Sequence, residues 1–307
     1  MENNIYDLAI LGAGPAGICA AIYATRAKLN TIWLDRKFVQ GGQIVDTYEV
    51  DNYPGLPGIT GLDLGEAMAG HAEKLGLKPK REPVLSVADE GEIKVIRTKK
   101  NEYHAKAVII ACGATHRHLG IPGEEELGGM GVSYCATCDA AFFQEGTVAV
   151  VGGGNVAVED AILLSRTCRK VYLVHRRDEL RAEKILQDSL FGCHNVELVW
   201  DSVPVSVEGE DKVTALKVRN VKTDEEKEIP VDGVFIAVGI VPGSGKFKDL
   251  VKMDESGYII AGEDGVTSTP GIFAAGDIRT KNLRQVVTAV ADGANAVASV
   301  QRYLMES

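Results

Sequence analysis

The feature that most constrains this chain is a strand–turn–helix unit that it contains twice. In the first copy, the apolar run 7–11 is followed by a glycine turn at 12–17 and a helical stretch at 18–27. In the pattern G-x-G-x-x-G, the glycines permit a tight turn, a close approach of phosphate and close helix–strand packing. Free N–H groups at the helix start attract the phosphates. The nucleotide contacts expected in this copy are Gly12, Gly14, Pro15, Ala16 and Gly17.

The second copy begins 140 residues later, at Gly152. Its strand is expected at 147–151, its G-x-G-x-x-A turn at 152–157, its helix at 158–165 and its next strand at 170–174. Each glycine motif alone is also compatible with an ordinary turn, but the surrounding strands and helix favour a nucleotide site. The contacts expected in this copy are Gly152, Gly154, Asn155, Val156 and Ala157.

The two copies differ 23 residues after the first glycine, where the second strand ends. The first copy has Asp35, which is placed to accept hydrogen bonds from ribose hydroxyls. The second has His175-Arg176-Arg177, with Arg181 four residues further on. A carboxylate repels a 2′-phosphate, whereas a guanidinium group binds one bidentately. We therefore expect NADP(H) at the second site and an unphosphorylated ribose at the first, a solvated basic turn being the alternative.

The C-terminal region carries a third signal. A strand at 271–277 ends in Gly276 and Asp277, and an amphipathic pattern from 284 to 303 predicts a helix. Asp277 is suited to accept from the ribityl chain of a flavin. The helix start near Gln285 and Val286 is suited to stabilise negative charge on a reduced isoalloxazine. An ordinary strand–loop–helix edge is the alternative interpretation.

The domain organisation follows from two similar apolar runs, 108–113 and 234–239, each of which closes a nucleotide-binding unit. The proline-containing connectors that follow, 116–123 and 242–245, are natural hinges. We predict a discontinuous outer domain, 1–116 and 245–307, into which a second domain, 117–244, is inserted. The expected fold class is α/β, with two Rossmann-like, three-layer nucleotide-binding domains.

Composition narrows the range of partners. Asp and Glu number 43 against 33 Lys and Arg, and the resulting charge of −10 disfavours general binding to nucleic acid or membrane surfaces. No apolar run approaches the roughly 18 residues of a membrane span, and the first residues are not a basic signal region. We therefore expect a cytoplasmic protein, in which six cysteines seldom form a disulfide scaffold.

Cys135 and Cys138 form the only close cysteine pair, with the spacing of a redox-active dithiol. Asp139 is placed to act as general acid or base for the thiolate, a surface carboxylate or helix cap being the alternative. The pair is also half a zinc site, with His116 and His118 as the other half, but no second pair has the usual spacing and we predict no metal. Inert or partnerless thiols are expected at Cys19, Cys112, Cys168 and Cys193.

Taken together, these motifs closely resemble the bacterial-type, low-molecular-weight thioredoxin reductases from the first strand to the last helix. The resemblance rests on Cys-Ala-Thr-Cys-Asp at 135–139, His-Arg-Arg-Asp at 175–178, Gly-Gly-Gln at 41–43 and Gly-Asp at 276–277 followed by Arg284-Gln285. It implies FAD in the outer domain, NADPH in the inserted domain and a homodimer. The further FAD contacts that it implies are Asp35, Arg36, Gly41, Gly42, Gln43, Asn52, Ala111, Gly113, Gly276, Asp277, Arg284, Gln285 and Val286.

The same resemblance implies a function. Electrons are expected to pass from NADPH through FAD to the Cys135–Cys138 disulfide and on to thioredoxin, with Asp139 as the acid. Because the dithiol and the nicotinamide site share one domain, the inserted domain is expected to rotate between turnovers. The rival hypotheses are a reductase of another small redoxin or peroxiredoxin system, and a non-catalytic redox-sensing module.

Overall fold

The protein is described by a computed structural model that covers residues 5–47 and 50–306. The chain forms two compact units, one made of the residues up to 115 and from 241 onward, the other of residues 116–240. Sequence analysis placed the two crossings at 116/117 and 244/245. The two connecting stretches contain β7 (Ala114–His116) and β16 (Ile240–Pro242), which pair in a two-stranded sheet.

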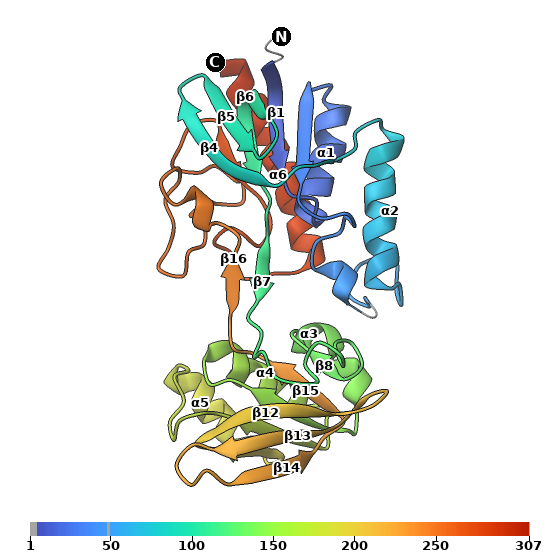
Figure 1. Cartoon of the computed structure of the whole chain (residues 1–307), viewed down its shortest axis with the longest axis vertical. Helices are drawn as coiled ribbons and strands as arrows, with labels where there is room; N and C mark the ends of the chain where they lie inside the picture. Colours follow the sequence, from blue (N-terminus) through green and yellow to red (C-terminus); the bar gives the residue numbers. More distant parts are fainter. Residues whose placement is uncertain (1–4, 48–49, 307) are drawn as a thin grey trace. The chain divides into compact units, whose positions relative to one another are not determined.

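The first unit contains one seven-stranded sheet, in the order β3-β2-β1-β6-β5-β4 with β17 also paired to β6 (Figure 1). Strands β1, β2, β3, β6 and β17 are parallel, whereas β4 and β5 are antiparallel to their neighbours. The elements of this unit besides β7 and β16 are β1 (Ile5–Leu11), α1 (Pro15–Arg26), β2 (Thr31–Asp35), η1 (Ile44–Asp46), α2 (Gly61–Lys74), β3 (Lys80–Arg81), β4 (Val84–Glu90), β5 (Ile93–Thr98), β6 (Glu102–Ile110), η3 (Gly245–Phe247), β17 (Ile272–Ala274) and α6 (Val286–Glu306).

Alternating side chains of β1 enter two cores, one on each face of the sheet. Leu8 and Ile10 pack with α1, α2 and α6, whereas Ala9 and Leu11 pack with apolar residues of the segment 247–278. This arrangement follows from the two-residue period of a strand with both faces covered. The apolar run read from the sequence as a buried strand therefore lies at the centre of a three-layer unit.

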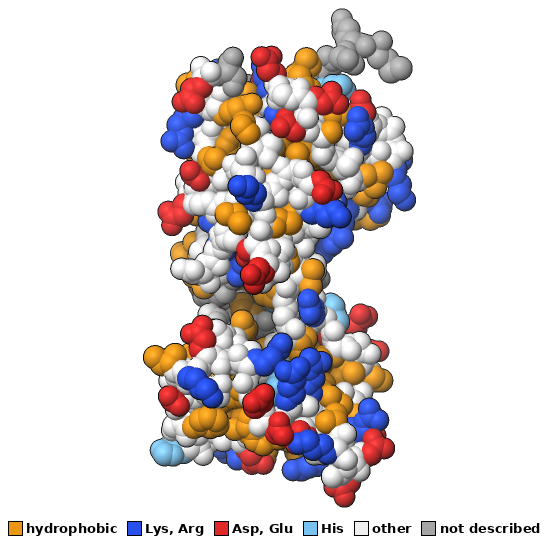
Figure 2. Space-filling view, turned by 90° about the vertical axis from the view of Figure 1, so that its left-hand side faces the viewer, with side chains coloured by type: hydrophobic (Ala, Val, Ile, Leu, Met, Phe, Trp, Pro, Cys, Tyr) orange, Lys and Arg blue, Asp and Glu red, His pale blue; other side chains and the backbone are white. Residues whose placement is uncertain are grey.

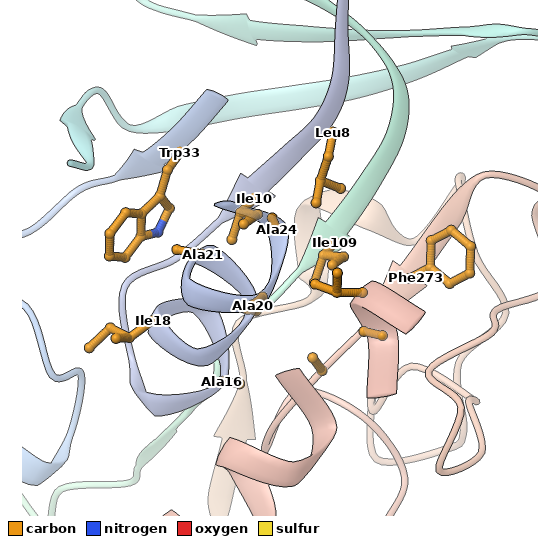
Figure 3. Packing of buried hydrophobic residues seen from close by; sticks show 14 of the residues in the cluster. Leu8, Ile10, Ala16, Ile18, Ala20, Ala21, Ala24, Trp33, Ile109 and Phe273 are labelled. Carbon is orange, nitrogen blue, oxygen red and sulfur yellow. The ribbon is translucent and has the colours of Figure 1, made fainter. Parts of the chain in front are cut away.

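Small side chains allow α1 and α6 to pack closely. Ala16, Ala20, Ala21 and Ala24 of α1 lie in one core cluster with small residues of α6 (Figure 3). At Gly293 of α6, an added Cβ would lie 2.2 Å from the Ala16 carbonyl oxygen. This close crossing brings the second turn of α6, far along the chain, against the first two turns of α1.

The second unit contains a five-stranded sheet, β11-β10-β9-β15-β8, and a three-stranded antiparallel sheet, β12-β13-β14. One face of β9 packs on α4 and α5, and the other packs on the three-stranded sheet. The elements are β8 (Val132–Ser133), α3 (Ala136–Asp139), η2 (Ala140–Phe143), β9 (Thr147–Val151), α4 (Asn155–Ser165), β10 (Lys170–Val174), α5 (Lys184–Phe191), β11 (Val196–Val199), β12 (Ser202–Gly209), β13 (Val213–Asn220), β14 (Glu226–Pro230) and β15 (Gly233–Ile236).

The expected α/β fold class is confirmed, and the expected strands at 147–151 and 170–174 match β9 and β10. Helices α1 and α4 begin three residues earlier than expected, at Pro15 and Asn155, because the middle glycine of each turn is already the N-cap. Across the residues that the structure describes, no helix is both long and apolar enough to cross a membrane.

Candidate functional site

The first glycine turn is held by contacts that leave no space for a side chain at Gly12. Gly12 has φ +113°, and an added Cβ would lie 2.3 Å from the carbonyl oxygen of Ala111. The indole Nε1–H of Trp33 donates to the Gly12 carbonyl at 2.9 Å. Gly14 is the N-cap of α1 and provides no side-chain cap, so the first N–H groups of this helix stay available to an anion.

The loop 41–43 covers this turn. The N–H of Gly41 donates to the carbonyl of Ala13 at 2.7 Å, and an added Cβ on Gly42 would lie 3.0 Å from the Cα of Gly14. Gln43 continues the loop and donates through Nε2 to the carbonyl of Ala114. Three of the predicted FAD residues are therefore brought over the turn by packing between distant segments.

Asp35 lies at the end of β2, beside a pocket of about 190 Å³. Burial raises the pKa of Asp35, although the backbone N–H groups and charges of Arg36 and Lys37 oppose the shift. Arg81, whose β3 position pairs with Asp35, places its guanidinium carbon 2.9 Å from the centroid of the Phe38 ring. Phe38 lies within the stretch 35–43 expected near FAD, whereas Arg81 was not predicted, because only the pairing of β2 with β3 brings Arg81 to this pocket. The pocket is lined by Asp35, Lys37, Phe38, Gln40, Pro79 and Arg81.

The Gly276–Asp277 turn follows β17 and lies against α1. Gly276 has φ +79°, and an added Cβ would lie 2.9 Å from the Cβ of Ala16. The Oδ1 atom of Asp277 is buried and has no hydrogen-bond partner, and burial raises the pKa of this carboxyl. A buried acceptor without a partner, such as Asp277 Oδ1, needs a hydrogen-bond donor, and a ligand that carries a hydroxyl group would supply one.

The segment before α6 gathers three more predicted residues. The Arg284 guanidinium lies 4.1 Å from the centroid of the Tyr258 ring, and its Nε is buried without a hydrogen-bond partner. Gln285 accepts through Oε1 from Asn52 Nδ2 at 3.0 Å, although the two residues are 233 positions apart. Helix α6 begins at Val286, two residues later than the sequence pattern predicted.

The second glycine turn has the same backbone form but an open outer side. An added Cβ on Gly152 would lie 2.5 Å from the carbonyl oxygen of Ala237, whereas one on Gly154 would meet no atom within 4 Å. Asn155 pairs with Glu183, donating through Nδ2 to its Oε1 at 3.1 Å and accepting from its N–H at 2.9 Å. Val156 is exposed and Ala157 is buried.

The basic cluster after β10 divides into exposed and buried members. Arg176, Arg177 and Arg181 are exposed, and their guanidinium groups make no hydrogen bond or ion pair to the described part of the chain. Figure 2 shows a compact group of Lys and Arg side chains on the visible face of this unit. His175, grouped with the arginines in the sequence analysis, is instead 4% exposed.

The His175 ring lies directly under the second turn. An added Cβ on Gly153 would be 2.3 Å from the ring, and Nε2 has no hydrogen-bond partner. Burial, followed by the charges of the neighbouring arginines, lowers the pKa of His175, so the ring is neutral near pH 7. The neutral, buried ring packs against Gly153 of the turn and adds no charge beside the three arginines.

Cys135 and Cys138 form a disulfide at the start of α3, with their Cα atoms 5.3 Å apart. The N–H of Cys138 donates to the Sγ of Cys135 at 3.2 Å. Ser133 accepts through Oγ from the N–H of Cys135 at 3.1 Å and donates to Asp139 Oδ2 at 2.6 Å. Burial raises the pKa of Asp139, and the Ser133 hydrogen bond offsets part of that shift.

The histidines of the zinc alternative serve other contacts. His118 Nδ1 lies 2.9 Å from the hydroxyl of Tyr134, and the His116 ring stacks on the Tyr134 ring with centroids 5.2 Å apart. The two sulfurs of the dithiol are bonded to each other. Within residues 5–47 and 50–306, no set of three or more His, Cys, Asp or Glu side chains is arranged to hold a metal ion.

The four remaining cysteines lie apart from the disulfide as free thiols. Burial raises the pKa of Cys19 to about 11 and also raises the pKa values of Cys112 and Cys168. Cys112 lies just after β6, which ends at Ile110. Since the thiolate is the reactive form, these raised pKa values make the three thiols poor nucleophiles.

The chain is similar to known proteins over almost its whole length. Residues 6–293 match the pyridine nucleotide-disulphide oxidoreductase family. Two thioredoxin reductases, from Listeria innocua and Bacillus subtilis, are 48% and 46% identical over 306 residues, which are 99% of this chain and 96% of each relative. The crystal structure of thioredoxin reductase from Streptococcus pyogenes matches with a TM-score of 0.95 and 45% identity over 100% of both chains. The chain therefore belongs to the pyridine nucleotide-disulphide oxidoreductases and, within them, to the thioredoxin reductases.

Proposed function

We propose that this chain is an NADPH-dependent thioredoxin-disulfide reductase. The observation that carries the proposal is the Cys135–Cys138 disulfide, which lies beside the half-buried Asp139 in the same unit as a glycine turn flanked by arginines. The family uses FAD and NADPH. FAD, when bound, supplies a carrier that accepts a hydride from NADPH and releases two electrons to a disulfide.

The residues of the first unit fit FAD. The turn at 12–17 offers uncapped N–H groups to a pyrophosphate, and Asp35 offers a carboxylate to a ribose. The unpartnered Oδ1 of Asp277 is suited to a ribityl hydroxyl. The residues proposed to surround FAD are Gly12, Gly14, Pro15, Ala16, Gly17, Asp35, Arg36, Gly41, Gly42, Gln43, Asn52, Ala111, Gly113, Gly276, Asp277, Arg284, Gln285 and Val286.

The residues of the second unit fit NADPH. The uncapped N-terminus of α4 is open to a pyrophosphate, because no atom lies near the position of a Gly154 Cβ. Three guanidinium groups without a carboxylate partner suit the 2′-phosphate. The proposed contacts are Gly152, Gly154, Asn155, Val156, Ala157, Arg176, Arg177 and Arg181, with His175 supporting the turn.

The chain's own residues then carry out thiol–disulfide exchange. Reduction of the Cys135–Cys138 bond takes two electrons and two protons and leaves two thiols; Asp139 supplies one proton from its carboxyl and solvent supplies the other. One thiol next gives its proton back to the Asp139 carboxylate, and the resulting thiolate attacks a sulfur of the partner's disulfide, giving a mixed disulfide and releasing one partner thiolate. The second cysteine attacks its neighbour's sulfur, re-forms the Cys135–Cys138 bond and releases the reduced partner.

Spectroscopy and a single substitution test this assignment. The purified protein is expected to be yellow and to bleach on addition of NADPH. Cys138→Ser should still bleach with NADPH but should lose NADPH-dependent reduction of thioredoxin, since the remaining thiol cannot form the intramolecular disulfide. A colourless protein, or a Cys138→Ser variant that turns over thioredoxin at the wild-type rate, would contradict the proposal.

Asp139 gives the reaction a pH dependence. Because burial raises the pKa of Asp139, its acid form persists to higher pH than that of an exposed aspartate, and the proton-consuming step slows as pH rises through this pKa. Asp139→Asn should slow reduction of the disulfide about 100-fold and abolish that pH limb. Stopped-flow measurement across pH checks both effects, with the exposed Asp211→Asn as control.

Three further properties stay predictions: a homodimer, a cytoplasmic location, and rotation of the inserted unit between turnovers. Light scattering of the purified protein tests the first. Screening thioredoxins and other small redoxins for NADPH-dependent reduction tests the choice of partner, and a preference for a peroxiredoxin system would favour the rival hypothesis.

A further inference from the structure

A buried ion cluster lies behind the turn that carries Asp277. We name Arg279, Lys281 and Asp292 the Asp292 cluster. The Asp292 carboxylate accepts from Arg279 Nη2 at 2.6 Å, from Arg279 Nε at 2.9 Å and from Lys281 Nζ at 2.9 Å. All three side chains are at least 93% buried. Two cations share one carboxylate, so this buried cluster has a net positive charge.

The cluster also fixes the backbone of the turn. Asp292 Oδ2 accepts from the N–H of Gly276 at 2.9 Å, which joins the turn to α6. Arg279 Nη1 donates to the carbonyls of Ala261 at 3.3 Å and Thr280 at 2.8 Å. One carboxylate on a core helix therefore determines where the turn with Asp277 lies relative to the first glycine turn.

The charges of the cluster act on Asp277. Burial raises the pKa of Asp277, whereas Lys281, Arg284 and Arg279 lower it and Asp292 raises it. Burial is the largest of these effects and leaves the pKa of Asp277 raised, whereas the two cations of the cluster outnumber its one carboxylate and oppose that rise. An ionised carboxylate with a free Oδ1 is a stronger hydrogen-bond acceptor than a carboxylic acid.

We propose that the Asp292 cluster is a positioning device for FAD, in which Asp292 holds the Gly276–Asp277 turn and Lys281 places positive charge behind the carboxyl that accepts from a hydroxyl of the cofactor. The inference rests on the proposed placement of FAD in the first unit. The three residues of the cluster act through Asp277 and the Gly276 backbone. Through these two residues the cluster determines the affinity of the protein for FAD.

The test measures the dissociation constant of FAD by titrating apoprotein and following the quenching of flavin fluorescence. Lys281→Met removes one cation while the bidentate Arg279–Asp292 pair remains, and it should weaken FAD binding about tenfold. Lys281→Arg, which keeps the charge, should restore most of the affinity. Because loss of the lysine raises the pKa of Asp277, the affinity of Lys281→Met should begin to fall at a higher pH than that of the wild type as pH decreases.

A double-mutant cycle separates this role from a structural one. In an Asp277→Asn background, Lys281→Met should have little further effect on FAD affinity, since the carboxylate through which Lys281 acts is gone. An equal weakening in both backgrounds, or an unchanged affinity and pH profile, would overturn the inference. Should Lys281→Met fail to fold, Lys281→Gln makes the same comparison. A wild-type chain that binds no FAD would refute the proposed function itself, which is a separate outcome.

Discussion

The two glycine turns share a backbone form, but only the first is covered. Gly14 and Gly154 both serve as uncapped N-caps with nearly the same dihedral angles, φ −80° and ψ −178° against φ −94° and ψ −177°. The loop 41–43 lies over the first turn, with Gly42 against Gly14. Nothing lies within 4 Å of the Cβ position at Gly154. The two turns therefore differ in cover and not in backbone geometry, which fits the proposal of a retained cofactor at the first turn and an exchanging coenzyme at the second.

The turns also differ in how closely the helix approaches the strand. At Gly17 an added Cβ would lie 2.0 Å from the Gly12 carbonyl oxygen, so only glycine fits there. The matching residue of the second copy is Ala157, whose side chain is accommodated and fully buried. The first helix therefore packs more tightly on its turn than the second.

The largest effect is expected from placing at position 17 the alanine that the second copy has at position 157. Gly17→Ala forces a methyl group into the backbone carbonyl of Gly12, and neither the helix backbone nor the turn backbone can move away easily. We therefore expect the unfolding free energy to fall by about 3 kcal/mol or more and the bound flavin to be lost. The converse change, Ala157→Gly, should cost only about 1 kcal/mol, the ordinary penalty of glycine in a helix. Urea unfolding and flavin absorbance measure both, and similar losses in the two variants would contradict the comparison.

A second prediction concerns the group at the ribose position, which is Asp35 in the first copy and the arginine cluster in the second. Arg176→Ala combined with Arg177→Ala removes two charged donors at about 1.5 kcal/mol each, so KM for NADPH should rise about 100-fold. KM for NADH should change little, because NADH lacks the 2′-phosphate. Arg219→Ala, an exposed arginine of the same unit that pairs with Asp224, is the control. Equal changes for both coenzymes would refute the 2′-phosphate assignment.

The smallest effect concerns the support beneath the second turn. Gly153→Ala places a methyl group against the His175 ring and should cost about 1–3 kcal/mol of stability, with weaker NADPH binding and unchanged flavin content. His175→Ala removes the ring, so the double variant should recover part of the loss. Thermal unfolding and KM for NADPH measure this cycle, and a double variant with purely additive losses would show that the ring and the turn act independently.

Sequence patterns predicted the parts of the site that are built from residues close together in the sequence. Strand β9, its glycine turn and β10 span fewer than thirty residues, and their spacing and hydrophobicity are enough to predict them. The Cys135–Cys138 pair was likewise predicted from its spacing. The burial of His175 under Gly153 was not predicted, because the sequence contains nothing that distinguishes a ring packed under this glycine from one exposed beside it.

The sequence by itself therefore determined the two strand–turn–helix elements, the cysteine pair and the family, because each depends on residue types at short, regular spacing. Only the tertiary structure decided which turn is covered, that Asn52 meets Gln285, that Arg81 reaches the pocket of Asp35 and that Asp292 holds the Gly276 turn. Those contacts join residues on different elements. They depend on how the helices and strands pack, and no local pattern of residues encodes that packing.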